Sequence, residues 1–137
     1  MKNSILSLLP LALLTACLGP VNFNDPAYVE QKAYRVSERV TTKLITDKPS
    51  RREAFNIALA DLKVLEGKTN TTMLEVIAIV QRLPKLENSK ANFWVETTVL
   101  IFEDELSRVG VKNPAMVMPA VKGLARGVGE GLEKTKP

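Results

Sequence analysis

Residues 121–132, "VKGLARGVGEGL", govern how the C-terminal part of this chain can pack, because three of their glycines are spaced four residues apart. On an α-helix, residues with this spacing lie on one face. Glycine has no side chain, so the shared face would be a smooth groove, flanked by two apolar side chains. The groove and its flanks comprise Gly123, Gly127, Gly131, Leu124 and Val128.

A helix carrying this groove is expected to be the weakest in the chain. Each glycine in a helix interior costs about 0.8–1 kcal/mol relative to alanine, and Gly129 adds a fourth to the three of the groove. Faces of small residues spaced in this way let another backbone approach closely. Three alternatives stay open: packing against another helix of the same domain, a flexible tail, or binding of a protein partner through the five groove residues.

Upstream of the groove, apolar periodicity and capping residues predict four helices. Asp25–Pro26 supplies an N-cap and a first-turn proline for the first helix, which Pro49 ends. Capping boxes at Ser50–Glu53 and Thr72–Glu75 begin the second and third helices. The third is apolar around most of its circumference and is therefore expected to be central. The first carries a stripe of residues at helical spacing: Val29, Ala33, Val36, Val40 and Leu44.

Residues 92–110, "NFWVETTVLIFEDELSRVG", form the ambiguous fourth segment. Their β-branched and aromatic residues suit a strand, but the apolar positions step by three and four over a length typical of a helix, so a helix is predicted. The patterns together predict an all-α domain over 25–133, a compact bundle of four helices with a weaker Gly-rich fifth C-terminal helix, followed by a tail over 134–137. Short loops predict that consecutive helices run antiparallel.

The beginning of the chain has the layout of a secretory signal peptide. Lys2 supplies a positive charge, an apolar run extends from Ile5 to Leu14, and the small residues Thr15 and Ala16 precede Cys17, the one cysteine of the chain. The run is about half as long as the ~20 residues that span a bilayer as a helix. A cleaved export signal is therefore favoured over a permanent membrane span.

The end of this run, Leu14–Thr15–Ala16–Cys17, resembles the lipobox of bacterial lipoproteins. The resemblance implies that the Cys17 thiol receives a diacylglycerol, that residues 1–16 are removed, and that the new amino terminus is acylated. Residues 17–24 would then be a lipidated tether. Leu18 is not the Asp that resembles an inner-membrane retention signal, which implies the outer membrane, facing the periplasm. The alternative is a non-lipidated signal peptide in which Cys17 is incidental.

The composition narrows the possible chemistry. The 137 residues contain one Cys and no His, which excludes an intramolecular disulfide and most zinc, haem and iron–sulfur sites. It also excludes Ser-His-Asp and Cys-His catalysis. Chemistry based on carboxylates, lysine or a hard metal ion stays open, but no motif of the sequence points to it, and we expect no metal, no cofactor and no catalytic residues. The net charge of +4 is too small to indicate nucleic acid, for which a clustered basic face is expected.

Two charged patterns are candidate sites. A row of basic residues at helical spacing could contact lipid phosphates near the anchor, or be an ordinary solvated face; it comprises Lys32, Arg35, Arg39 and Lys43. Carboxylates at Glu96 and at Glu103–Glu105 raise the hypothesis of glycan or lipid hydrolysis, which needs two acids facing one cleft. Helical spacing places adjacent acids on different sides, so a solvated acidic face is favoured.

These patterns lead to one functional hypothesis and two alternatives. The hypothesis is a non-enzymatic, membrane-anchored envelope lipoprotein that docks or scaffolds a protein partner; one concrete form is a pilotin-like chaperone, which it resembles in class and size alone. The first alternative is binding to anionic lipid through the basic row. The second is an envelope glycan or lipid hydrolase.

Overall fold

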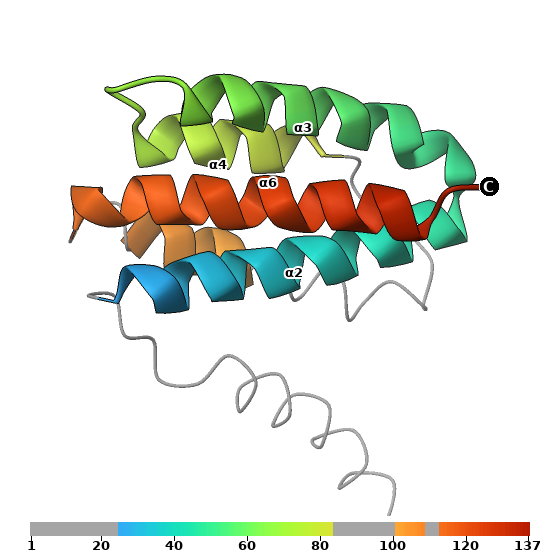
Figure 1. The fold of residues 1–137 in the computed structure, drawn as a ribbon, viewed down its shortest axis with the longest axis horizontal. Coiled ribbons are helices and arrows are strands. Elements are labelled where there is room, and N and C mark those ends of the chain that lie inside the picture. The colour runs from blue at the N-terminus through green and yellow to red at the C-terminus, as the bar shows by residue number, and fades with distance from the viewer. Residues whose placement is uncertain (1–24, 84–100, 109–112) are drawn as a thin grey trace, which may run out of the picture.

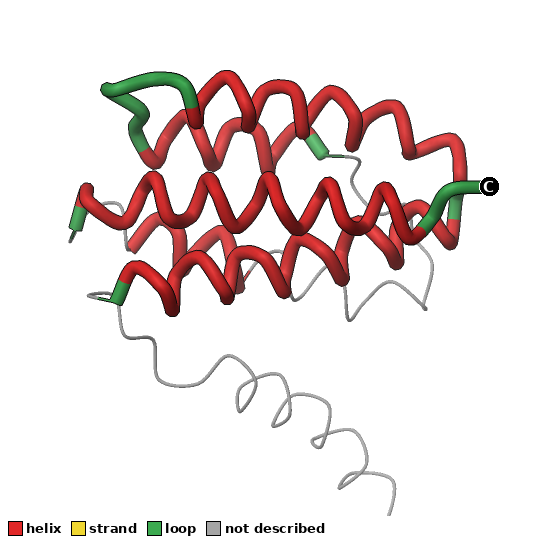
Figure 2. Tube along the Cα trace, viewed as in Figure 1, coloured by secondary structure: helices red, strands yellow, loops and turns green. Residues whose placement is uncertain are grey.

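The computed structural model describes residues 25–83, 101–108 and 113–137, and every regular element in these ranges is helical (Figure 1, Figure 2). The α-helices are α2 (Pro26–Asp47), α3 (Arg52–Glu66), α4 (Met73–Arg82) and α6 (Val117–Lys134), and residues 101–108 form a further helical segment. Short 3-10 helices, η1 (Pro49–Arg51) and η3 (Pro114–Met116), precede α3 and α6. The predicted all-α fold is confirmed. The lipobox, the tether and Glu96 lie outside the described residues.

Two of the predicted helix starts are confirmed by their capping hydrogen bonds. The Asp25 carboxylate accepts from the Ala27 amide at 3.0 Å, and Pro26 is the first residue of α2. At α4, Thr72 and Glu75 form the reciprocal capping box, in which the Thr72 amide donates to Glu75 Oε2 at 2.8 Å. Each cap satisfies amides that have no carbonyl partner within the first helical turn.

The capping box predicted at Ser50–Glu53 is wrong. Ser50 and Arg51 belong to the 3-10 helix η1, and α3 begins at Arg52 without a side-chain cap. Arg51 is buried and donates to the Leu44 carbonyl at 3.3 Å, whereas Arg52 donates to the Leu132 carbonyl at 3.0 Å. The two guanidinium groups therefore connect the start of α3 to the C-terminal ends of α2 and α6.

Consecutive helices run antiparallel, as predicted, from α2 to α3 and from α3 to α4 (Figure 1). α6 runs along α2 in the same direction, since Gly123 lies beside Ala33 and, further along both helices, Gly131 lies beside Thr41. α6 contacts α2, α3 and α4 and lies between α2 and α3 (Figure 1). The first and last helices of the described domain are thus its most extensively packed pair.

The core is largely aliphatic and is built around α6. Ten of the 18 residues of α6 are buried. Tertiary packing therefore supports a helix whose glycine content would make it weak in isolation. α4, which we expected to be central, packs on one side only, and its Leu74 is 78% exposed. The apolar stripe predicted on the first helix is buried: Val29, Ala33, Val36, Val40 and Leu44.

Candidate functional surfaces

The glycine groove of α6 is filled by α2 of the same chain. A Cβ atom added at Gly127 would lie 2.5 Å from the Tyr34 carbonyl oxygen and closer still to Ser37 Oγ. One added at Gly131 would lie 2.6 Å from Thr41 Cβ. Real Cβ atoms do not approach other atoms so closely, so the two backbones can meet in this way only because these positions are glycine.

Of the three alternatives for the groove, the structure shows packing within the domain. Gly123, Gly127 and Gly131 are buried, as are Leu124 and Val128, which are 4% and 3% exposed. The prediction that these five residues bind a protein partner is therefore corrected, because α2 and the core already cover them. They are structural residues that bring the first and last helices together.

The complementary row on α2 was missed from the sequence. Ala33, Ser37 and Thr41 are spaced four residues apart and face the three glycines in register. Ser37 Oγ donates to the Ala33 carbonyl at 2.6 Å, which satisfies its hydroxyl inside the interface. A search for small residues at the glycine spacing would have marked this row as one candidate occupant of the groove.

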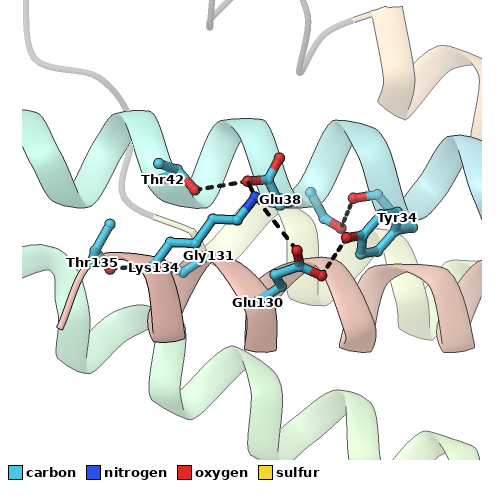
Figure 3. A network of polar contacts seen from close by, with 8 residues as sticks. Tyr34, Glu38, Thr42, Glu130, Gly131, Lys134 and Thr135 are labelled. Atoms are coloured by element: carbon cyan, nitrogen blue, oxygen red, sulfur yellow. Dashed lines mark hydrogen bonds and ion pairs between the residues drawn. The ribbon is translucent and has the colours of Figure 1, made fainter.

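Polar side chains line the outer edge of the contact between α2 and α6 (Figure 3). The Tyr34 hydroxyl donates to the Glu130 carboxylate. Lys134 Nζ lies 2.9 Å from Glu38 Oε1 and 3.4 Å from Glu130 Oε1. The Arg126 guanidinium lies 4.7 Å from the centre of the Tyr34 ring, within range of a cation–π interaction. These contacts add side-chain specificity to the glycine packing.

This network shifts the pKa values of Glu130 and Lys134. The hydrogen bond from Tyr34, together with Lys134, holds the pKa of Glu130 below the ordinary 4.5. Hydrogen bonding to Glu38 raises the pKa of Lys134 above the ordinary 10.5. Because the lowered pKa of Glu130 favours its carboxylate in the folded state, the resulting stabilisation is present at neutral pH and is lost as the pH falls through that lowered value.

The predicted basic row divides into two parts. Arg35, Arg39 and Lys43 are exposed, and no ion pair joins them to another described residue. The prediction that Lys32 contacts a lipid surface is wrong. Its Nζ lies 2.6 Å from Glu105 Oε2, and its side chain is only 9% exposed. The Glu105 side chain is 17% exposed. This partly buried ion pair fastens the helical segment 101–108 to α2.

The acidic cluster predicted as a possible hydrolase site is not assembled within the described residues. Glu105 pairs with Lys32, whereas Asp104 Oδ2 lies 2.9 Å from Arg108 on an exposed side. Burial and the charge of Glu105 raise the pKa of the nearby Tyr28 phenol. No group of three potential metal-ligating side chains occurs in the part of the chain that the structure describes.

A small cavity, partly open to its surroundings, lies between the helices of the described part of the bundle. Its volume is about 30 Å³, room for about one or two water molecules and far below the hundreds of Å³ of typical ligand pockets. Its walls are almost entirely apolar and come from α2, α3, α4, α6 and Phe102. A cavity of this volume has no room for a substrate.

The remaining features of the described surface are apolar side chains on the outer helices. Ile57 and Val64 on α3 are 56% and 61% exposed, and Leu74 on α4 is 78% exposed. No helix within residues 25–83, 101–108 and 113–137 has the length and apolar character to cross a membrane.

No family model, curated protein or solved structure matches this chain.

Proposed function

We propose that this protein is a lipid-anchored component of a bacterial cell envelope that acts without catalysis by docking a protein partner at the membrane. The observation that carries the proposal is the lipobox, with Cys17 placed eight residues before Asp25, the N-cap of α2. By the same resemblance, Leu18 favours the outer membrane. A pilotin-like escort of another envelope protein is one form that this role could take.

The physical chemistry of acyl chains supports a permanent anchor. Each buried CH₂ contributes about 0.8 kcal/mol, so one chain binds marginally and two or three chains hold the protein firmly. The seven residues between Cys17 and Asp25 extend at most about 25 Å. The helical domain would therefore stay close to the bilayer and would meet partners in or next to the membrane.

Docking of a partner must use a surface other than the glycine groove. The exposed apolar side chains Ile57 and Val64 project from α3, which lies on the far side of α6 from α2 (Figure 1). Apolar side chains exposed on a helix surface bury area when a partner covers them. They support docking on the α3 side and leave α2 available for another role.

Replacing Cys17 with serine is expected to release the protein from the membrane. The serine hydroxyl cannot form the thioether that carries the diacylglycerol. In a strain that exports and processes the wild type, the amount of protein in the membrane pellet should be at least about tenfold lower for Cys17→Ser. The reason is that two acyl chains make dissociation of the wild type negligible. Density-gradient fractionation of the wild type would then distinguish the outer from the inner membrane.

A substitution that spares the thiol provides the control. Thr69→Ser changes an exposed loop residue and should leave the distribution unchanged. Mass spectrometry of the wild type should show Cys17 carrying a diacylglycerol as the first residue. An unmodified thiol in a freely soluble product would contradict the proposed function.

A photo-crosslinking residue at Ala60, which is exposed on the same side of α3 as Ile57 and Val64, tests the docking role. In intact cells this probe should yield a discrete crosslinked protein. The same probe at Lys122, exposed on α6, should yield several-fold less of that product. Equal crosslinking from both positions, or none from either, would count against a partner on α3.

A further inference from the structure

We propose that the exposed basic face of α2, formed by Arg35, Arg39 and Lys43, lies against the anionic phospholipid surface that holds the acyl chains of Cys17. This inference rests on the proposed lipid anchor and adds an orientation to it. The bundle would be held with α2 toward the bilayer and α3 away from it.

The basic face is continuous and is not neutralised from within the domain. Its three residues are spaced four apart, which places them on successive turns along one side of α2. All three are exposed, and none forms an ion pair with another residue of the described ranges. Glu38 and Glu30 of α2 are turned toward α6, where they pair with Lys134 and Arg126. Asp47, the third acid of α2, pairs with Arg51.

Basic residues elsewhere on the described surface are mostly neutralised. Six of them form ion pairs with carboxylates: Lys68, Arg82, Arg108, Arg126, Lys134 and Lys136. Lys63 on α3 and Lys122 on α6 are also exposed without an ion pair to a described residue, but they lie on different helices and do not form a row. The row on α2 is therefore the concentrated uncompensated positive charge among the described residues.

The position of this face relative to the anchor selects a membrane as its partner. α2 is the helix that begins directly after the tether, so its charges stay near the lipid surface. Each cation within a Debye length of an anionic leaflet, about 10 Å at 0.1 M salt, strengthens binding about fivefold. Three cations are fewer than the six to ten phosphate contacts typical of proteins that bind DNA.

Such an orientation has a consequence for docking. α2 and α3 lie on opposite sides of α6 (Figure 1). With the basic face on the bilayer, Ile57 and Val64 of α3, which are more than half exposed, would point away from the lipid. The anchor and the basic face together would present one side of the bundle to a protein partner.

Site-specific thiol labelling of the acylated full chain tests the orientation, because Cys17 is the one native cysteine and its sulfur is blocked by the lipid. Thr46→Cys reports on the basic face and Ala60→Cys on α3, both at exposed positions. On vesicles of equal parts phosphatidylcholine and phosphatidylglycerol, a membrane-impermeant maleimide should label Thr46→Cys about tenfold more slowly than on phosphatidylcholine alone. Ala60→Cys should react equally on both, and high salt should remove the difference.

Matched charge variants show whether the effect belongs to this face. Adding Arg35→Gln with Arg39→Gln should abolish the protection of Thr46→Cys. Adding Lys63→Gln with Lys122→Gln, which changes the net charge equally, should leave it intact. Equal rates on the two vesicle types, or equal effects of the two charge variants, would overturn the inference.

Two further outcomes separate this inference from the proposed function. If the chain without an introduced cysteine is labelled, Cys17 is unmodified and the lipid anchor itself is refuted. If that chain is unlabelled but Thr46→Cys is protected by duplex DNA and not by anionic vesicles, the anchor stands and the membrane orientation is wrong.

Discussion

Replacing Gly127 with alanine is expected to destabilise the domain by about 2 kcal/mol, although alanine is the better helix former. A Cβ at this position would collide with Ser37 Oγ and would lie 2.5 Å from the Tyr34 carbonyl oxygen and 2.8 Å from the Glu38 amide nitrogen. Backbone atoms cannot rotate away, so α2 and α6 must separate. Overpacking of this kind costs up to about 3 kcal/mol, of which the helix propensity of alanine recovers about 1 kcal/mol.

The neighbouring glycine provides a matched control within the same helix. A Cβ at Gly129 would meet only Leu59 Cδ2 at 3.9 Å, an ordinary contact. Gly129→Ala is therefore expected to stabilise the domain by up to about 1 kcal/mol. Urea unfolding of the mature, non-acylated chain, followed by far-UV circular dichroism, would measure both. Equal stability of the two variants would show that α2 does not fill the groove.

Replacing Lys32 with methionine is expected to destabilise the domain by about 3 kcal/mol at neutral pH. Methionine preserves most of the aliphatic side chain but leaves the Glu105 carboxylate, 17% exposed, without its ammonium partner. Removing one member of a buried ion pair typically costs about 3–5 kcal/mol because the remaining charge is desolvated and unpaired. The lower end applies because this pair retains some contact with solvent. Thermal or urea unfolding would measure the loss.

The double variant and an exposed pair provide the controls. Lys32→Met with Glu105→Leu removes both charges and should return to within about 1 kcal/mol of the wild type, since apolar replacement of a buried pair is often neutral. Arg108→Ala breaks the pair with Asp104, whose side chains are 66% and 61% exposed, and should cost less than about 0.5 kcal/mol. A Lys32→Met protein as stable as the wild type would contradict the proposed role of the pair.

Local sequence patterns predicted most of the described helices because their causes lie within a few residues. The Asp25 and Thr72 caps act on amides two or three residues away, and the stripe from Val29 to Leu44 depends only on helical periodicity. The capping box at Ser50–Glu53 failed because Arg51 and Arg52 form hydrogen bonds with carbonyls of α2 and α6. Those tertiary partners stabilise a start for α3 that the local sequence does not favour.

The candidate surfaces were less predictable than the helices, because exposure depends on which faces meet. A basic row at regular spacing is the same pattern whether or not an acid from another segment approaches it. In the structure Lys32 forms an ion pair with Glu105 and is largely buried. The other members of the row are exposed: Arg35, Arg39 and Lys43. The glycine row likewise fixes only that some backbone can approach closely, and does not say which one.

The sequence by itself determined that this chain is helical, where its described helices carry their apolar faces, and that one face of the last helix is bare backbone. It also contains the stretch Leu14–Thr15–Ala16–Cys17, whose resemblance to a lipobox is the basis of the proposed anchor. Only the tertiary structure decided that α2 fills the bare face, in parallel and in register with Ala33, Ser37 and Thr41. The physical reason is that periodicity and capping involve residues close in the sequence. Pairing the first helix with the last is a non-local contact, and its outcome depends on how every apolar face of the chain can pack against every other.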